Sequence, residues 1–488
     1  MTPSPEHPSL WGRRRRPCTS SQLAVACFLL LARGRVAEVD GSAEDVTKTK
    51  HPVILVPGVH GCVFRVKLTE AFSAPSEICR GPREWLKPSP FNLLNPSFKD
   101  CQIAQLTPTF DRSESRWRNA TGVELDWSVD FGGVDGISVL DHSARNATPW
   151  FKSMIDELVR IGYQPGKNLH GAPFDWRLAP DGWSQQGEFY DRLRTLIERT
   201  VLANRAPAHL VAHSLGSTAV LGFLAGMPPA WKHQHIASFV PITPNFGGAV
   251  TNVMTFVYGF DPGLPIPHDY MRALYTRLPS GAAQMPTPGA FLSDPPIVVS
   301  SRRNYTASDI SALLDDLGHS QAGLAYRRLS ARRQRSDQLP RPGVPVVLLT
   351  GSGFPTPRTV AFSGSLSPAH DLKPSQVVYG DGDSVVNQES SLWAVKETSA
   401  MHSRMKHQKR SPLPTKPRET SAMYENMKHQ KMSPSPPVEH GRQSREAWPG
   451  TRHEDFFGVD HYSALWNRRV LRALSKHILG YKRPVVYK

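Results

Sequence analysis

From about residue 50 onward, the chain alternates between two patterns of apolar positions. Continuous apolar runs that end near Gly, Pro or Ser predict four buried strands: 52–57, 208–212, 237–242 and 344–349. Apolar residues at helical spacing predict amphipathic helices over three stretches: 150–161, 189–202 and 464–478. Strands that alternate with helices are typical of a mostly parallel sheet covered by helices on both faces, so the sequence predicts an α/β fold.

The first 34 residues have the layout of a secretory signal peptide. Arg13 to Arg16 precede an apolar run from Leu23 to Ala32, and small residues at Ala32 and Gly34 suit signal peptidase. The run is too short to span a bilayer comfortably, although a retained signal anchor is the alternative. No later stretch is apolar for long enough to form a membrane helix, so we expect a soluble mature protein.

Cysteines and sequons indicate an oxidising compartment. In such a compartment Cys79 and Cys101 could pair and stabilise the fold by about 3 kcal/mol, which leaves Cys62 as the odd thiol. Three Asn-X-Thr sequons predict glycosylation sites: Asn119, Asn146 and Asn304. We therefore expect a protein of the secretory pathway, either secreted or held in a lysosome-like or vacuole-like compartment.

The formal charge of +16 lies mostly outside the predicted fold. Residues 1–35 carry +5 and residues 396–452 carry +7, so the rest of the chain carries only +4. A dedicated nucleic-acid surface would cluster Lys and Arg on folded elements, so we expect no nucleic-acid partner.

An internal repeat interrupts the α/β pattern. ETSAMHSRMKHQKRSP at 397–412 returns as ETSAMYENMKHQKMSP at 419–434, with a period of 22 residues. The segment is basic and poor in branched apolar residues, so it cannot bury enough surface to offset its chain entropy. We expect a disordered insertion over 395–450, either a tolerated surface loop or, less simply, a polybasic tether or processing site.

The segment around Ser214 predicts a nucleophile elbow. An apolar run ends at Ala212, and a helix is expected from near Thr218. The elbow requires small residues two positions before and after the serine, and Ala212 and Gly216 meet this requirement. The setting of strand, turn and helix therefore predicts that Ser214 is a catalytic nucleophile.

A serine nucleophile needs a base and a carboxylate, which follow it in chain order in this type of fold. The Gly-rich turn 379–385 offers Asp383, although Asp381 suits the spacing equally well. His461 lies in a loop before the last predicted helix, where a base has room to move. The backbone N–H groups of Val59 and Leu215 are the expected oxyanion donors. This chemistry needs no cofactor and no metal, and no residue cluster has zinc or calcium spacing.

Six segments resemble one known family, in the same order along the chain: 51–61, 172–178 (APFDWRL), 212–216 (AHSLG), 304–306 (NYT), 353–358 (GFPTPR) and 381–385 (DGDSV). The family is that of lecithin:cholesterol acyltransferase and the lysosomal group XV phospholipase A2. The likeness spans about 51–393 and 455–480. It implies an α/β-hydrolase fold with Ser214 as nucleophile, Asp383 rather than Asp381 as acid, and His461 as base.

The resemblance also implies two lipid-handling parts. A disulfide between Cys79 and Cys101 would close a small membrane-binding subdomain, and a lid would cover about 250–288. Apolar residues enclosed by the disulfide would contact the lipid surface, unless they are buried under a cap: Trp85, Leu86 and Phe91. The chain would then consist of a signal peptide (1–34), a hydrolase core with cap and lid (51–394), the insertion (395–450) and the rest of the core with His461 (451–488).

The sequence departs from the family pattern at several places. There is no Cys pair near 350 and 395 for a second disulfide, and the insertion separates acid from base. The family's Ala-Pro-Trp-Gly-Gly is Thr-Pro-Asn-Phe-Gly-Gly at 243–248, and its Leu-Gly-Asn is His-Gly-Cys at 60–62. These changes concern the acyl acceptor more than the nucleophile.

We therefore expect a lipid O-acyltransferase with phospholipase A activity. It would bind peripherally to a phospholipid membrane or lipoprotein surface, form an acyl-enzyme, and pass the acyl group to a sterol, another lipid alcohol or water. Two alternatives are open: a serine esterase for small substrates, and a non-catalytic lipid-binding protein that has kept the hydrolase fold.

Overall fold

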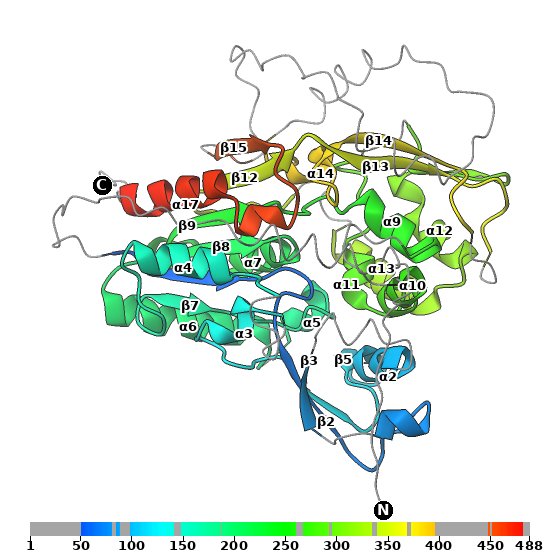
Figure 1. Cartoon of the computed structure of the whole chain (residues 1–488), viewed down its shortest axis with the longest axis horizontal. Helices are drawn as coiled ribbons and strands as arrows, with labels where there is room; N and C mark the ends of the chain where they lie inside the picture. Colours follow the sequence, from blue (N-terminus) through cyan, green and yellow to red (C-terminus); the bar gives the residue numbers. More distant parts are fainter. Residues whose placement is uncertain are drawn as a thin grey trace, which may run out of the picture. The chain divides into compact units, whose positions relative to one another are not determined.

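The computed structural model in Figure 1 describes most of the chain between residues 50 and 481. The described ranges are 50–80, 84–87, 98–140, 148–185, 187–259, 267–291, 295–333, 339–367, 372–395, 448 and 451–481. The predicted signal peptide, the sequon at Asn146, Phe91 and nearly all of the predicted insertion lie outside these ranges.

A six-stranded parallel sheet forms the centre of the fold. Its order is β15-β12-β9-β8-β1-β7. The strands are β1 (Val53–Val56), β7 (Leu169–Gly171), β8 (Ala208–His213), β9 (Ile236–Ile242), β12 (Val347–Ser352) and β15 (Arg452–Phe457). Every residue of β1, β8 and β9 is buried, which explains why these strands are mainly apolar in the sequence.

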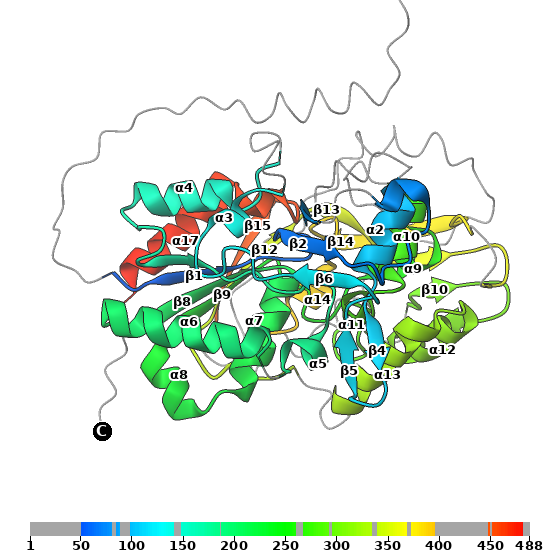
Figure 2. The same ribbon diagram turned by 90° about the horizontal axis from the view of Figure 1, so that it is seen from below.

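Helices cover both faces of this sheet, as Figure 2 shows. One face carries α3 (Asp135–Ser138), α4 (Lys152–Arg160) and α17 (Arg468–Gly480); the other carries α6 (Phe189–Asn204), α7 (Leu215–Gly226) and α8 (Pro229–His235). Of the apolar residues that define the first two predicted helices, Met154, Leu158, Leu193 and Ile197 are fully buried, whereas Ile161 and Leu196 are partly buried. The predicted α/β fold is confirmed.

A disulfide-closed subdomain follows β1. It contains the sheet β3-β2-β6, the hairpin of β4 and β5, and the helix α2. Their bounds are β2 (Phe64–Leu68), η1 (Glu77–Arg80), β3 (Glu84–Lys87), α2 (Lys99–Leu106), β4 (Thr109–Asp111), β5 (Arg116–Arg118) and β6 (Val123–Asp126). The bond between Cys79 and Cys101 joins η1 to α2, as predicted.

The described residues of the predicted lid range form three helices. They are α9 (Val250–Val257), α10 (His268–Tyr275) and α11 (Pro279–Ala283), and they lie beside η5 (Ala307–Asp309), α12 (Ile310–Asp316) and α13 (Ser320–Arg333). Helix α10 contacts α2 of the disulfide-closed subdomain, and the two lie side by side in Figures 1 and 2. Within the described ranges, no helix has the length and apolar content that crossing a bilayer requires.

A second sheet, β11-β10-β13-β14, carries the acidic turn. Its strands are β10 (Val298–Val299), β11 (Asn304–Tyr305), β13 (Phe354–Ala361) and β14 (Gln376–Gly382), and α14 (Gln388–Ser391) follows. On either side of the predicted insertion the chain comes back to the same place, because the N–H of Trp448 donates to the carbonyl of Ala394 at 3.1 Å. Strand β15 then joins the central sheet beside β12.

Several predicted boundaries differ from those of the structure. Strand β12 begins at Val347 instead of residue 344, since Pro345 has no N–H to donate to a ladder. Helix α7 begins at Leu215, directly after the elbow, and not near Thr218. The last predicted helix is divided into η6 (Ser463–Leu465) and α17, because the side chain of Asn467 caps α17 by accepting from the N–H of Arg469. The capping residue, and not the apolar periodicity, therefore determines where α17 begins.

Candidate active site

Ser214 lies on a sharp, strained turn between β8 and α7. Its φ and ψ are +52° and −125°, a backbone conformation that a residue with a side chain rarely adopts. The turn is packed closely against the end of β1: a Cβ added to Gly216 would lie 2.1 Å from the carbonyl oxygen of Pro57. Only glycine fits at 216, which is the physical basis of the small residue predicted at that position.

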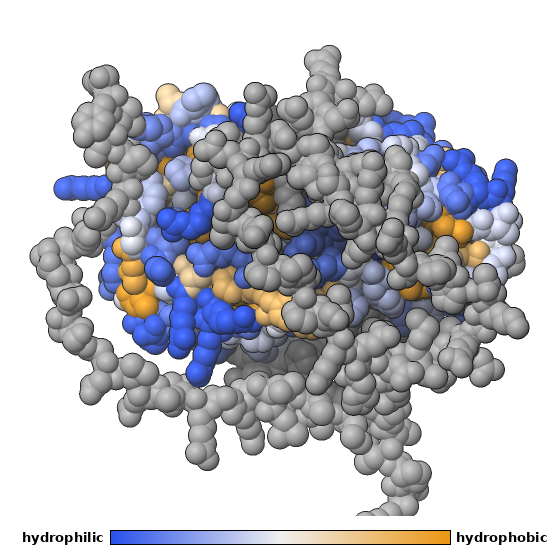
Figure 3. Space-filling view, turned by 90° about the horizontal axis from the view of Figure 1, so that it is seen from above, coloured by the Kyte–Doolittle hydropathy of each residue, from blue (hydrophilic) through white to orange (hydrophobic). Residues whose placement is uncertain are grey.

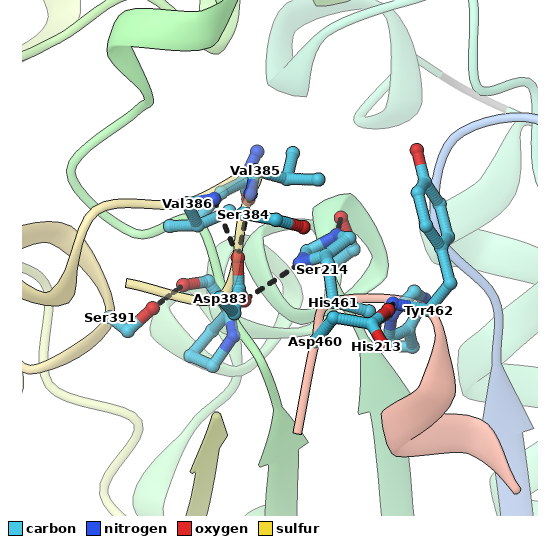
Figure 4. Close-up of polar contacts among 12 residues, drawn as sticks. His213, Ser214, Asp383, Ser384, Val385, Val386, Ser391, Asp460, His461 and Tyr462 are labelled. Atoms are coloured by element: carbon cyan, nitrogen blue, oxygen red, sulfur yellow. Dashed lines mark hydrogen bonds and ion pairs between the residues drawn. The ribbon is translucent and has the colours of Figure 1, made fainter. Parts of the chain in front are cut away.

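Three side chains from distant parts of the chain meet at this turn, as Figure 4 shows. The Nε2 atom of His461 lies 2.8 Å from the Oγ atom of Ser214, and its Nδ1 atom lies 2.9 Å from the Oδ2 atom of Asp383. All three are buried, with exposures of 4% for Ser214, 2% for His461 and 1% for Asp383. Serine, imidazole and carboxylate therefore form one hydrogen-bonded series out of contact with bulk water.

The carboxylate of Asp383 is held by the turn that follows it. Its Oδ1 atom accepts from the N–H groups of Val385 and Val386 at 3.1 and 2.6 Å, which leaves Oδ2 directed at the imidazole (Figure 4). Asp381, the alternative left open by the sequence spacing, accepts instead from the N–H of Gly353 at 2.7 Å. The two carboxylates of the Asp-Gly-Asp turn thus lie in different places, and only Asp383 contacts His461.

His213 is a residue of this site that the sequence reasoning missed. Its Nε2 atom lies 3.0 Å from the carbonyl oxygen of His461, and the two rings are 4.9 Å apart. Burial lowers the pKa of His213 well below its ordinary value, and the neighbouring His461 lowers it further. The ring is therefore neutral, and its Nε2–H donates a hydrogen bond to the carbonyl oxygen of His461. Its position next to the predicted nucleophile was the only signal available in the sequence.

The two expected oxyanion donors lie in segments adjacent to Ser214. The N–H of Leu215 is in the first turn of α7, where amides have no partner within the helix. Val59 lies in the turn that follows β1, closed by a 3.1 Å hydrogen bond from the N–H of Gly61 to the carbonyl of Gly58. That turn is adjacent to the nucleophile, since a Cβ on Gly58 would lie 2.9 Å from the Cβ of Ser214.

The disulfide-closed subdomain exposes apolar side chains next to its two cysteines. Ile78 is 46% exposed and Phe98 is 38% exposed. Of the residues predicted to contact lipid, Trp85 and Leu86 are on β3, and Phe91 lies outside the described residues. On another face, shown in Figure 3, hydrophobic residues form patches among mainly hydrophilic ones.

The remaining predicted site residues have distinct surroundings. Asn304 is exposed on β11, whereas Asn119 is partly buried and its Oδ1 atom accepts from Arg177 at 2.7 Å. The thiol of Cys62 is buried and donates to the carbonyl of Phe174 at 3.2 Å, and burial raises its pKa. Within the described ranges, no group of three or more His, Cys, Asp or Glu side chains could hold a metal ion.

The parallel sheet, the elbow after β8, and the carboxylate and imidazole that follow β14 and β15 define an α/β-hydrolase fold. Comparison with known proteins identifies the family. A model of the lecithin:cholesterol acyltransferase family matches residues 83–322.

Three relatives illustrate the likeness. The chain is 30% identical over 368 residues to phosphatidylcholine-sterol acyltransferase of Mus musculus, which covers 73% of this chain and 80% of the relative. It is 29% identical over 395 residues to lysosomal phospholipase A and acyltransferase of Canis lupus familiaris, and 29% over 401 residues to lecithin-cholesterol acyltransferase-like 1 of Arabidopsis thaliana. Each of these two alignments covers 78% of this chain and 89% of the relative.

The chain belongs to the lecithin:cholesterol acyltransferase family. Among solved structures, a chain of the Tle4-Tli4 complex aligns with 70% of this chain and 88% of its own length, at 12% identity and a TM-score of 0.38. A likeness of that size supports no conclusion about this protein.

Proposed function

We propose that the protein is a lipid O-acyltransferase with phospholipase A activity, in which Ser214 is the nucleophile, His461 the base and Asp383 the acid that orients it. The observation that carries the proposal is the hydrogen-bonded series from the Oγ atom of Ser214 through both ring nitrogens of His461 to the Oδ2 atom of Asp383. Membership of a family whose named relatives are acyltransferases and a phospholipase A supports the substrate class.

The first half of the reaction forms an acyl-enzyme. His461 takes the proton of Ser214 as its oxygen attacks the carbonyl carbon of a fatty-acyl ester in a phospholipid. The N–H groups of Val59 and Leu215 stabilise the tetrahedral oxyanion. His461 then donates its proton to the leaving alkoxide, which departs as a lysophospholipid and leaves an ester on Ser214.

The second half transfers the acyl group. A sterol or other lipid alcohol, or water, loses its proton to His461 and attacks the acyl-enzyme. The new ester or the free fatty acid leaves, and Ser214 regains its proton. The buried position of the three side chains supports this sequence, because an electrostatic contact is stronger where water is excluded.

Peripheral binding to a phospholipid membrane or lipoprotein surface is the proposed mode of substrate access. The exposed apolar side chains of Ile78 and Phe98, on the subdomain closed by the disulfide, support this mode. Secretion through a signal peptide at 1–34, to the exterior or to a lysosome-like compartment, is part of the same proposal. Asn304 is the better candidate for glycosylation of the two described sequons, since its side chain is exposed and that of Asn119 is engaged by Arg177.

A single assay tests the activity. Purified protein is incubated with phosphatidylcholine vesicles, with and without cholesterol, and lysolipid, fatty acid and steryl ester are measured. We expect lysolipid from the wild type and none from Ser214→Ala, whereas the exposed-serine control Ser301→Ala keeps wild-type activity. Labelling by a fluorophosphonate probe should follow the same pattern.

The alternatives give different results in this assay. A small-substrate esterase would hydrolyse a soluble short-chain ester without any rise in rate when the substrate forms a bilayer. A non-catalytic lipid-binding protein would bind vesicles but release no lysolipid and take up no fluorophosphonate.

A further inference from the structure

The turn that follows β1 is joined to the lid-range helix α10 through one side chain. His60 comes directly after Val59, and its Nε2 atom lies 3.0 Å from the hydroxyl of Tyr275, the last residue of α10. These residues are 215 positions apart in the sequence. The same imidazole packs against the ring of the fully buried Trp176, with centroids 4.2 Å apart.

The backbone at His60 needs such support. Its φ is +59°, in the left-handed region, which costs free energy for a residue with a side chain. A strained conformation of this kind persists only where the surroundings hold it. The 3.1 Å hydrogen bond that closes the turn joins backbone atoms only, whereas the contacts with Tyr275 and Trp176 hold the side chain of His60 in place.

The N-terminal end of helix α10 contacts the disulfide-closed subdomain through an ion pair and a hydrogen bond. Asp269 forms an ion pair with Lys99 of α2, and the buried hydroxyl of Tyr270 donates to the Oε1 atom of Gln102 at 3.1 Å. A continuous series of contacts therefore runs from α2, next to Cys101, along α10 to the turn beside Ser214.

We propose that His60 is a positioning residue, which holds the N–H of Val59 in place for the oxyanion through its hydrogen bond to Tyr275 and so couples this donor to α10 and the disulfide-closed subdomain. The proposal deepens the proposed function and rests on it, because it assigns a control point to the same site. An oxyanion donor must be placed accurately to act, so a looser turn lowers the rate of acyl transfer more than it weakens substrate binding.

The contact does not require a charged imidazole. Burial lowers the pKa of His60 to about 4, so the ring is neutral above that value and Nε2 either accepts from or donates to the tyrosine hydroxyl.

A double-mutant cycle tests the proposal with a soluble p-nitrophenyl ester. We expect His60→Leu and Tyr275→Phe each to lower kcat by about 2- to 10-fold with little change in KM, the range expected for one hydrogen bond. The double variant should be no slower than the slower single variant, because both remove the same contact. His60→Gln, whose amide reaches a similar position, should retain most of the activity.

The matched control is Tyr258→Phe, which removes a hydroxyl from the segment between α9 and α10, where the ring packs against His268. Its kcat should equal that of the wild type. Losses of kcat that multiply in the double variant would overturn the proposal. So would equal losses of kcat in His60→Gln and His60→Leu, or a change in KM alone.

Hydrogen exchange of the peptide 56–63 separates this proposal from the proposed function. Faster exchange in Tyr275→Phe than in the wild type and Tyr258→Phe supports the coupling even if no Ser214-dependent turnover is found. Unchanged exchange overturns it, even if the enzyme is fully active.

Discussion

His461 and Asp383, 78 residues apart in the chain, are joined by two hydrogen bonds. The Nδ1 atom of His461 contacts the Oδ2 atom of Asp383 at 2.9 Å, and its backbone N–H donates to the carbonyl of Asp383 at 2.8 Å. The backbone contact fixes the loop and the side-chain contact fixes the tautomer and orientation of the imidazole. Base and acid thus behave as one unit despite the long segment between them.

Replacement of this acid should remove most of the activity. Asp383→Asn keeps the shape of the side chain but favours the wrong tautomer of His461, so we expect kcat to fall by about 10³- to 10⁴-fold. Asp381→Asn is the matched control, since that carboxylate accepts from Gly353 and should change kcat by less than about 3-fold. Equal losses in the two variants, measured as lysolipid release, would contradict the assignment.

A methyl group at Gly216 should disrupt the elbow. The added Cβ would lie 2.1 Å from the carbonyl oxygen of Pro57, a backbone atom that cannot easily move. We expect Gly216→Ala to cost about 3 kcal/mol or more in the free energy of unfolding and to abolish fluorophosphonate labelling. Gly226→Ala, at the end of the same helix, meets no atom within 4 Å and should be close to wild type in both measurements.

Most of the repeat-containing segment should be dispensable. Because the N–H of Trp448 bonds to the carbonyl of Ala394, a short link is enough to join the two sides. We expect deletion of 398–445 to leave the melting temperature within a few degrees of the wild type and to preserve hydrolysis of a soluble ester. A large loss of either would show that the segment contributes to the folded core.

Acid should destabilise the protein through two histidines, His209 on β8 and His477 on α17. The hydroxyl of Ser238 lies 2.8 Å from the Nδ1 atom of His209 and 2.9 Å from the Nε2 atom of His477. Burial lowers the pKa of His209 well below its ordinary value, and burial lowers that of His477 to about 4.

In both cases the folded state binds protons less readily than the unfolded chain, whose histidines titrate near 6.5. Stability from these groups is therefore present above pH 6.5 and is lost as the pH falls from about 6.5 towards 4. Urea unfolding at several pH values checks this. In His477→Gln, which keeps a polar group for Ser238, the free energy of unfolding should fall less steeply with decreasing pH than in the wild type. An identical slope in the two proteins would count against the assignment.

The disulfide should stabilise the fold and serve the lipid interface. It closes a 22-residue separation between Cys79 and Cys101, so its removal should cost about 3 kcal/mol. We expect the double Ser variant to lose more activity on vesicles than on a soluble ester. Dithiothreitol should lower the melting temperature of the wild type but not that of this variant.

The local sequence was sufficient for the elbow. A strand that is buried throughout is mainly apolar, and a turn packed against another backbone must have small residues, so Ala208 to Gly216 carry the information within nine positions. The α/β architecture follows from the same short-range patterns. Boundaries such as the start of α17 depended on a capping side chain that apolar periodicity does not detect.

Residue spacing left two carboxylates equivalent, the resemblance favoured one of them, and the tertiary structure shows the physical reason. Asp381 and Asp383 occupy the same Gly-rich turn, but β14 ends at Gly382, so the first stays beside Gly353 and the second leaves the strand towards His461. The contact of His60 with Tyr275 has no local signature at all, because it depends on how α10 packs against the turn after β1. The spacing of apolar residues determines the helices and strands, whereas the packing of these elements determines which distant residues come into contact.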